Sequence, residues 1–230
     1  MALYVVGTPI GNLNDMSKRA ADTLAQVDVI FCEDTRQTRK LLSHFNIHKR
    51  LIVVHEHNER AKLRGLLDLV RNHDAALVSD GGLPTISDPG YVLVRACRDE
   101  GIKVIPIPGA NAALTALIAS GFPTDSFYFA GFLPKKGNKK LREVLDKETV
   151  VILYESPHRI IKRIEAIAAY APSRKICIAR ELTKLHEEFL VGEASEMQHA
   201  PITPKGEFVI IIDKENKVST HQHTKKQKSI

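Results

Sequence analysis

Residues 75–90 read AALVSDGGLPTISDPG, an apolar run that ends in a loop of glycine, proline, serine and aspartate. The same arrangement occurs twice more, where residues 3–6 lead into GTPIGN at 7–12 and residues 103–107 lead into PGANA at 108–112. Glycine lets a backbone approach a ligand closely, and proline holds a loop rigid. Ligands of open α/β sheets bind beyond the carboxyl ends of the strands, so the three loops together predict a ligand site. Any one of them alone would be an ordinary turn.

Short apolar runs alternate with helical patterns on both sides of these loops. Residues 59–72 carry leucine and valine at i, i+3, i+4 and i+7, which predicts a helix, and 91–99 repeat the pattern. Strands that alternate with helices predict βαβ units and a largely parallel sheet. The strand candidates of this half are 3–6, 29–32, 51–54, 75–79 and 103–107.

The pattern changes near residue 120, where SGFPTD at 120–125 predicts a linker. The last strand candidates of the second half leave little room for a crossover helix, which predicts an antiparallel edge. The sequence therefore predicts two α/β domains, 1–120 and 121–213, with a cleft between them. A basic tail at 214–230 has the composition of a disordered segment. Later strand candidates are 127–130, 150–154, 175–180, 187–191 and 207–212, with helices at 137–145 and 157–169.

Composition excludes several classes of protein. The three cysteines are far apart and form no CxxC pair, so they predict buried free thiols instead of disulfides or a zinc site. The start of the chain lacks the features of a signal peptide, and no apolar run reaches the roughly 18 residues of a transmembrane helix. We therefore expect a cytoplasmic protein with no membrane segment. The net charge of +6 is compatible with an RNA partner.

Common nucleotide and hydrolase motifs are missing. The sequence has no GxGxxG after a strand, no GxxxxGK followed by serine or threonine, and no GxSxG. His55 and His57 flank Glu56, but no further cluster of metal ligands accompanies them, so we expect no metal site. The residues alone thus predict a ligand site without naming the ligand.

Further stretches, combined with the three loops, carry a resemblance to a known family. They are CEDTR at 32–36, GFLP at 131–134, YESPHR at 154–159 and ARELTK at 179–184. Residues 3–212 resemble the tetrapyrrole-methylase superfamily and, more narrowly, the bacterial small-subunit ribosomal RNA methyltransferase I family. The resemblance implies two α/β domains of the class III methyltransferase type with S-adenosylmethionine between them, often as a homodimer. It further implies 2′-O-methylation of a cytidine ribose near the decoding site of small-subunit ribosomal RNA. We expect the assembled 30S-type subunit as the substrate, with naked RNA left open.

The resemblance also implies which residues contact the cofactor. In the loops of the first domain they are Pro9, Gly11, Asp80, Gly81, Gly82, Leu83, Pro84, Ser87, Pro108, Gly109, Ala110, Asn111 and Ala112. In the second domain they are Tyr154, Glu155, Ala179, Arg180, Glu181 and Leu182, with Lys205, Gly206 and Glu207 near the adenine.

A base that takes the ribose hydroxyl proton is the least determined part of the site. Glu33 and Asp34 follow the second strand candidate and would face the cleft. Asp34 fits equally well as the N-cap of a helix that begins at Thr35. Glu181 and Lys184 are the alternatives.

Two groups of basic residues are candidates for RNA binding. Arg36 and Arg39 lie at i and i+3 of one predicted helix and could hold phosphates, although a solvated helix face explains them nearly as well. The segment KKGNKK at 135–140 concentrates positive charge after the first strand of the second domain, and we favour RNA docking over a merely solvated surface. Its lysines are Lys135, Lys136, Lys139 and Lys140.

Two other functions fit the sequence less well. A methylase of a corrin precursor would not need the EDTR and ARELTK stretches, and the basic charge speaks against it. A non-catalytic RNA-binding assembly factor would have no use for three intact cofactor loops.

Overall fold

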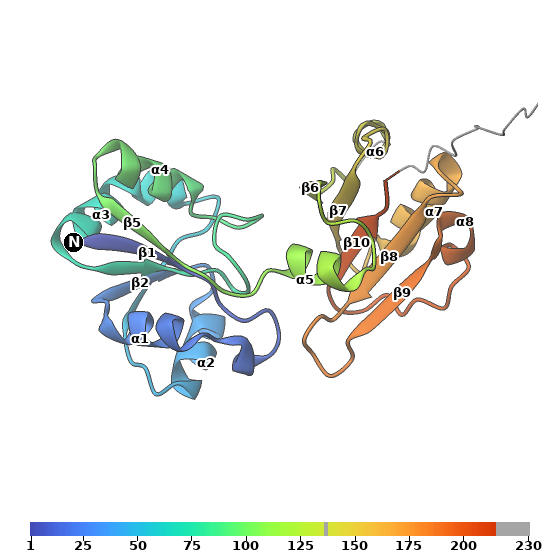
Figure 1. Cartoon of the computed structure of the whole chain (residues 1–230). Helices are drawn as coiled ribbons and strands as arrows, with labels where there is room; N and C mark the ends of the chain where they lie inside the picture. The colour runs from blue at the N-terminus through green and yellow to red at the C-terminus, as the bar shows by residue number, and fades with distance from the viewer. Residues whose placement is uncertain (136–137, 215–230) are drawn as a thin grey trace, which may run out of the picture.

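The computed structural model describes residues 1–135 and 138–214 and contains two five-stranded sheets with helices packed on them (Figure 1). The mixed α/β class predicted from the sequence is confirmed. Lys136, Gly137 and the predicted tail beyond Lys214 lie outside the described residues.

The first sheet is parallel throughout, with strand order β3-β2-β4-β1-β5. Its strands are β1 (Ala2–Val6), β2 (Val29–Cys32), β3 (Arg50–Val53), β4 (Ala75–Leu77) and β5 (Lys103–Ile107). Its helices are the 3-10 helix η1 (Leu13–Asp15), then α1 (Lys18–Gln26), α2 (Thr35–His44), α3 (Glu59–Asn72) and α4 (Tyr91–Asp99). The central strands β2 and β4 are fully buried, as strands covered on both faces must be.

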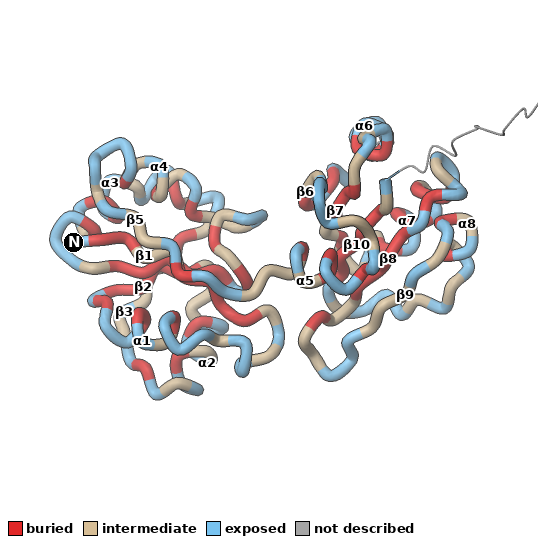
Figure 2. The backbone as a smooth tube through the Cα atoms, viewed as in Figure 1, coloured by how far each residue is buried: buried red, intermediate tan, exposed pale blue. Residues whose placement is uncertain are grey.

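Helices cover both faces of this sheet. Leu24 of α1 and Leu42 of α2 pack on one face, whereas Leu66 of α3 and Leu93 of α4 pack on the other (Figure 1). Their outward sides are exposed, so each helix presents one apolar stripe to the sheet (Figure 2). The helical patterns predicted for 59–72 and 91–99 are confirmed.

Strands β1 and β4 lie side by side at the centre of this sheet, but the chain leaves them in opposite directions. From β1 it runs through α1 towards β2, and from β4 it runs through α4 to β5 on the other side. Such a topological switch point opens a crevice at the carboxyl ends of the two strands. The fold therefore directs the loops that follow β1 and β4 towards a common ligand site.

The second sheet has the order β6-β7-β10-β8-β9, and only β6 and β7 are parallel. Its strands are β6 (Phe127–Phe132), β7 (Val150–Glu155), β8 (Lys175–Arg180), β9 (Glu188–Glu193) and β10 (Phe208–Ile212). The accompanying helices are α5 (Ala112–Ala119), α6 (Lys139–Leu145), α7 (Ile160–Tyr170) and α8 (Ala194–Met197). The predicted antiparallel edge is confirmed and extends inwards, because β10 inserts between β7 and β8.

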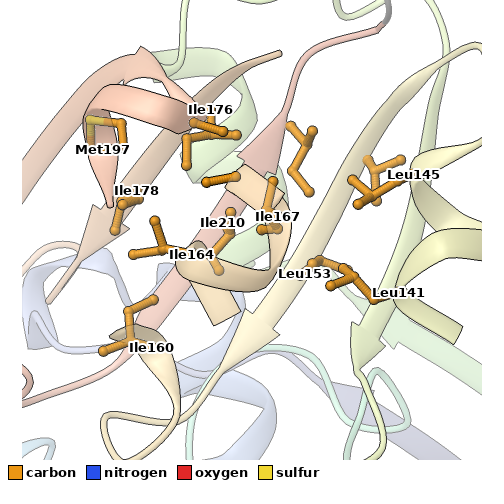
Figure 3. Packing of buried hydrophobic residues seen from close by; sticks show 14 of the residues in the cluster. Leu141, Leu145, Leu153, Ile160, Ile164, Ile167, Ile176, Ile178, Met197 and Ile210 are labelled. Atoms are coloured by element: carbon orange, nitrogen blue, oxygen red, sulfur yellow. The ribbon is translucent and has the colours of Figure 1, made fainter. Parts of the chain in front are cut away.

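Two apolar layers cover the second sheet. On one face, Leu141 of α6, Ile164 of α7 and Met197 of α8 form a continuous core with the strands (Figure 3). On the other face, α5 contributes Ala116 and Leu117. Helix α5 precedes the predicted domain boundary at residue 120, yet it packs on β7 and β10 of the second sheet. The division of the chain into domains at residue 120 stays a prediction.

Several local predictions needed correction. In the helix predicted at 157–169 the isoleucines do not share one face: Ile161 is 37% exposed, because it lies one residue, or about 100°, from the buried Ile160. Helix α7 begins at Ile160 instead of 157, since Ser156 to Arg159 form a turn in which the Ser156 carbonyl accepts from both Arg159 and Ile160. Helix α6 begins at Lys139.

The predicted state of the cysteines is confirmed, because all three are free and buried. Across the described ranges, the structure has no helix with the length and apolar character needed to cross a bilayer.

The loops after β1 and β5 touch through two glycines. A Cβ atom on Gly109 would lie 2.6 Å from the carbonyl carbon of Gly7, so neither backbone can give way to a side chain. In contrast, Gly65 lies on the exposed side of α3 with nothing within 4 Å of its Cβ position.

These two sites predict opposite changes in stability. Gly109→Ala should lower the free energy of unfolding by about 1–3 kcal/mol, because overpacking forces backbone shifts. Gly65→Ala should raise it by about 0.5–1 kcal/mol, because alanine is the better helix residue. Chemical denaturation of both variants measures these changes, and equal effects at the two positions would contradict the close approach of the loops.

Candidate functional site

A cleft of about 740 Å³ lies between the two sheets. The loops after β1, β4 and β5 line one side, and β7, β10 and the loop after β8 line the other. This volume falls within the range of small-molecule sites. The cleft is therefore large enough for a cofactor with part of a second substrate beside it.

A pair of backbone hydrogen bonds joins the first two loops. Thr8 N–H donates to the Gly82 carbonyl over 2.9 Å, and Gly82 N–H donates to the Thr8 carbonyl over 3.1 Å. Gly82 has a φ of +88°, and a Cβ there would lie 3.4 Å from Cγ2 of Ile10 and 3.5 Å from the carbonyl oxygen of Ala110. All three predicted loops thus converge on Gly82.

The loop after β4 contains an unusual concentration of left-handed backbone. Besides Gly82 and Gly90, Thr85 has a φ of 74° and Ser87 a φ of 63°. A β-branched residue such as threonine rarely adopts this conformation. Strained residues of this kind cluster at ligand sites, where the surrounding structure holds them in place.

Aromatic residues form the opposite wall. The Tyr154 hydroxyl accepts a hydrogen bond from Ala113 N–H over 3.3 Å, which ties β7 to the start of α5. The Tyr154 ring meets the rings of Phe129 and Phe132 edge-on, with centroids 5.1 and 5.5 Å away. Phe132 is 55% exposed and lines the cleft, so it presents a free ring face beside the site.

Glu155 was predicted to contact the cofactor, but its carboxylate is occupied. Arg163 Nε and Arg159 Nη2 both lie 2.7 Å from its two oxygens, and the residue is 3% exposed. Arg159 also donates to the Leu133 carbonyl over 3.0 Å. The YESPHR motif therefore braces the aromatic wall through a buried ion-pair network, in which the loss of one partner would leave a costly unpaired charge.

A second charged network lies in the ARELTK loop. Lys184 Nζ is 2.9 Å from both Glu181 Oε1 and Glu207 Oε2. Burial raises the pKa of Glu181, but the hydrogen bonds from Lys184 and from the Glu207 N–H outweigh it and leave that pKa below its usual value. A Cβ on Gly11 would lie 2.5 Å from Cγ of Lys184, so glycine is needed where the β1 loop reaches this network.

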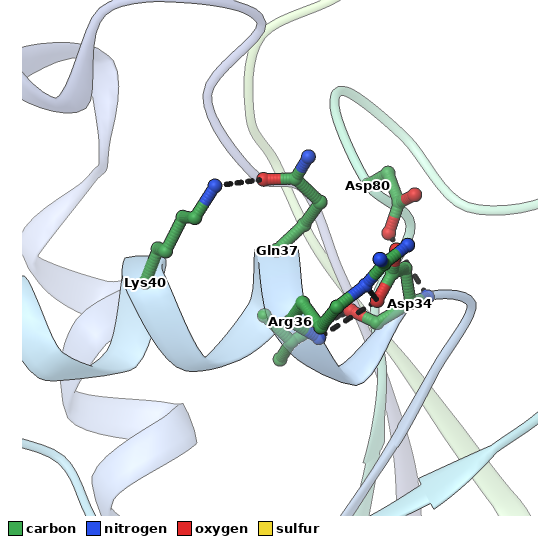
Figure 4. Close-up of polar contacts among 6 residues, drawn as sticks. Asp34, Arg36, Gln37, Lys40 and Asp80 are labelled. Atoms are coloured by element: carbon green, nitrogen blue, oxygen red, sulfur yellow. Dashed lines mark hydrogen bonds and ion pairs between the residues drawn. The ribbon is translucent and has the colours of Figure 1, made fainter.

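Asp34 proves to be the N-cap of α2, as one of its two predicted roles required (Figure 4). Its carboxylate accepts from Arg36 N–H over 2.8 Å and pairs with the Arg36 guanidinium, 2.7 Å from Nη2. These hydrogen bonds lower the pKa of Asp34 to about 2, which suits a base at neutral pH poorly. Its own N–H donates to Asp80 Oδ1 over 3.1 Å. Glu33 lies outside the cleft lining, and burial followed by repulsion from Asp80 raises the pKa of its carboxyl.

The residues predicted to bind RNA are spread over the surface. Arg36 is held by Asp34, Arg39 is exposed, and α2 instead turns Gln37, Lys40 and Leu41 towards the cleft (Figure 4). Lys135 and Lys139 are exposed as well, whereas Lys140 pairs with Glu143 over 3.0 Å. Lys136 lies outside the described residues, and docking of RNA by this segment stays a prediction.

The cleft lining overlaps the predicted cofactor set only in part. The predicted residues that line it are Pro9, Gly11, Asp80, Gly81, Gly82, Leu83, Ser87, Asn111, Ala112, Tyr154, Glu155, Leu182, Gly206 and Glu207, together with Lys184. Those behind the lining are Pro84, Pro108, Gly109, Ala110, Ala179, Arg180, Glu181 and Lys205. Arg180, for example, pairs with Glu188 over 3.2 Å and donates to the Lys205 carbonyl. Sequence reasoning missed Thr8, Ile10, Leu13, Gln37, Lys40, Leu41, Ile86, Asp88, Phe132, Ser156, Pro157, Phe208 and Val209.

Several of the missed residues stand in the quoted motifs, among them Thr8, Asp88 and Ser156, so the sequence carried a usable signal for them. His55 and His57 have ring centroids 6.0 Å apart, and within 1–135 and 138–214 no three His, Cys, Asp or Glu side chains form a group that could hold a metal ion.

Comparisons with known proteins identify the family to which the chain belongs. The family model of the Tetrapyrrole (Corrin/Porphyrin) Methylases matches residues 2–198. A protein named ribosomal RNA small subunit methyltransferase I from Halalkalibacterium halodurans is 50% identical over 217 residues, 92% of this chain and 75% of that one. Proteins of the same name from Bacillus subtilis and Hydrogenobaculum sp. are 47% and 45% identical and are covered over 75% and 97% of their lengths, with 93% and 94% of this chain matched.

A solved structure supports the fold independently. The crystal structure of diphthine synthase superposes with a TM-score of 0.76 over 93% of this chain and 90% of that one, at 11% sequence identity. At this identity the likeness concerns the fold alone.

Because the three loops converge on Gly82, a side chain at this position should disturb the site. Gly82→Val should weaken the binding of S-adenosylmethionine, the cofactor that the sequence resemblance implies, by about tenfold or more, or about 1.4 kcal/mol. The branched side chain would intrude between Ile10 and Ala110 and cannot easily adopt a positive φ. Titration calorimetry in the presence of a chelator measures the affinity.

Gly101→Val is the matched control, because Gly101 also has a positive φ, +72°, but lies at the far edge of the sheet with nothing within 4 Å of its Cβ position. It should lose stability while keeping its affinity for the cofactor. Equal affinities of the two variants for S-adenosylmethionine would show that Gly82 does not contact the cofactor.

Proposed function

Because the chain belongs to the tetrapyrrole (corrin/porphyrin) methylases and, among them, to the family named ribosomal RNA small subunit methyltransferase I, we propose that it is an S-adenosylmethionine-dependent ribosomal RNA methyltransferase. Its proposed product is a 2′-O-methylated cytidine ribose near the decoding site of the small subunit. The proposed setting is the cytoplasm, with the assembled 30S-type subunit as substrate. The observation that carries the proposal is the convergence of three glycine-containing loops on one side of an inter-sheet cleft.

The residues of the cleft fit the proposed cofactor. A Cβ at Gly82 would be in van der Waals contact with Ile10 and Ala110, and the φ of +88° disfavours any residue with a side chain, so the backbone there can approach a ligand closely. Asn111 caps α5 through its side chain, and Leu182 and Val209 supply apolar surface opposite the loops. S-adenosylmethionine, when bound there, would supply an activated methyl group. Loops held on rigid strands would orient it towards the acceptor, and alignment of reactants can contribute about 7–11 kcal/mol to catalysis.

The rim of the cleft suits an RNA acceptor. Lys40 of α2 lines it, and lysines hold RNA phosphates without reading the bases. The exposed ring of Phe132 could stack a nucleobase next to the cofactor, an interaction worth about 1–3 kcal/mol per base. We propose that the lysines of the 135–140 segment add phosphate contacts outside the cleft.

A corrin-precursor methylase remains the second candidate within the same superfamily. The relatives at 45–51% identity are named as ribosomal RNA methyltransferases, which supports the ribosomal RNA substrate instead.

The first test of the proposed function is the product in cells. Small-subunit ribosomal RNA from cells that lack this protein should miss one methyl group, which mass spectrometry of nuclease fragments should locate on a cytidine ribose. Restoring the gene should restore the mark. A mark on a base, or an unchanged methylation pattern, would contradict the proposal.

We also propose a homodimer, which exposed apolar residues of the second sheet support. Leu114 and Ile118 on the outer side of α5 are 45% and 76% exposed. Phe127 and Val191 lie on the same face of the sheet, opposite Val150 and Cys177 in the ladders, and are 42% and 53% exposed. Exposed apolar surface of this kind marks interaction sites.

Light scattering should therefore give a molar mass near twice the 25.6 kDa of one chain. Ile118→Glu should shift the mass towards that of the monomer, because a buried unpaired charge opposes association. Tyr170→Glu is the control, since Tyr170 is 42% exposed on α7, which covers the opposite face of the sheet. A wild-type mass of one chain at micromolar concentration would refute the dimer.

A further inference from the structure

Four carboxylates line the cleft among the residues that the structure describes, and three of them are engaged. Glu155 holds two arginines, Glu207 pairs with Lys184, and Asp80 accepts the N–H of Asp34. In the part of the chain that is described, neither Asp80 nor Asp88 forms an ion pair, but Asp80 is exposed, whereas Asp88 is half-buried and faces the negative charges of Glu33 and Asp80. Of the four, Asp88 is therefore the carboxylate whose surroundings most favour the uptake of a proton.

The strained loop after β4 delivers Asp88 to this position. Left-handed residues at Thr85, Ser87 and Gly90 turn the chain back over the end of β4, and a Cβ on Gly90 would lie 2.5 Å from Cδ2 of Leu77. On its other side the loop reaches the second sheet, where a Cβ on Gly131 would lie 3.1 Å from Oγ of Ser87. Asp88 therefore lies where the two halves of the cleft meet.

The charges around Asp88 come from three elements. Glu33 follows β2, Asp80 follows β4, and Tyr154 belongs to β7. Burial raises the pKa of the Asp88 carboxyl to about 6, repulsion from Glu33 and Asp80 adds to the increase, and the Ser79 hydroxyl opposes it. Burial also raises the pKa of the Tyr154 hydroxyl, with a contribution from the negative charge of Asp88 across the cleft. A base is most effective when its pKa lies near the working pH.

We propose that Asp88 is the catalytic base, which accepts the proton of the attacking hydroxyl in the cleft; this inference rests on the proposed function. The 2′-oxygen of the ribose forms a bond to the methyl carbon as the sulfur–methyl bond breaks and its electron pair stays on sulfur. The hydroxyl proton passes to a carboxylate oxygen of Asp88, which becomes neutral and later releases the proton to solvent.

The protonation of Asp88 can be followed without cofactor or RNA. In protein labelled with ¹³C at aspartate carboxyls, one resonance should titrate near pH 6 and be missing in Asp88→Asn. Glu33→Gln should move that titration to lower pH, because it removes a repelling charge. Asp99→Asn is the control, since Asp99 is an exposed residue at the end of α4 and its loss should leave the resonance in place. A spectrum in which Asp88 titrates near the usual aspartate range and ignores Glu33 would overturn the inference.

Methyl transfer provides the second readout. Wild-type activity should fall as the pH drops below about 6, because the base works only as the carboxylate, and Glu33→Gln should extend activity to lower pH. Asp88→Asn should reduce kcat by about 10²–10⁴-fold while leaving cofactor affinity unchanged. Its melting temperature should hold or rise, because an ionised carboxylate is no longer buried.

These outcomes separate the two proposals. An Asp88→Asn variant that methylates RNA at the wild-type rate, or that loses activity only because it melts earlier or binds cofactor less tightly, contradicts the role of Asp88 and leaves the proposed function standing. A wild-type protein that binds S-adenosylmethionine but methylates no ribosomal RNA contradicts the proposed function itself.

Discussion

Two reciprocal hydrogen bonds between Thr8 and Gly82 hold the rest of the site together. They join the loops that follow β1 and β4, the neighbouring strands from which the chain departs in opposite directions. Because both loops are fixed to strands buried on both faces, the crevice between them is formed before any ligand arrives. The close contact of Gly7 with Gly109 adds the loop after β5 to this frame. Glycine at these positions is thus a packing requirement of the backbone as much as a requirement of the ligand.

Charged residues of the motifs that carry the family resemblance serve mainly to shape the cleft. Asp34 and Arg36 fix the start of α2, Glu155 with its two arginines braces the wall of β7, and Lys184 links Glu181 to Glu207. Asp34 and Glu181, two of the predicted bases, are thereby paired with cations. What remains is Asp88, whose charge is opposed by burial instead of stabilised by a cation. This division explains how one cleft can contain many acidic residues and still leave one of them free for proton transfer.

The sequence predicted the parts of the fold that depend on local pattern. The strands of the first sheet and the helices α3 and α4 have strong periodicity, and their loops carry glycine and proline at strand ends, so their positions followed directly. Helix α5 was missed because ALTALIA is apolar on nearly every side and has no periodic face. The insertion of β10 between β7 and β8 depends on pairing between distant segments, which no local pattern records.

The sequence predicted those parts of the site that depend on local pattern, as it did for the fold. The three loops could be named from glycine and proline at strand ends, but the surroundings of each carboxylate could not. Whether a carboxylate meets a cation follows from the N-cap of α2 and from the backward turn of the loop 79–90. Gln37 and Lys40 line the cleft because of the way α2 is oriented about its axis, and only the packed structure determines this orientation.

A crystal structure of the protein with S-adenosylhomocysteine and a short RNA that carries the target cytidine tests the central claim most directly. The cofactor product should lie against Gly82 and Asn111 with the second sheet opposite, and the ribose 2′-oxygen should lie within about 3.2 Å of the Asp88 carboxylate. A cofactor bound away from the Thr8–Gly82 junction, or a ribose whose 2′-oxygen faces a different base, would contradict it.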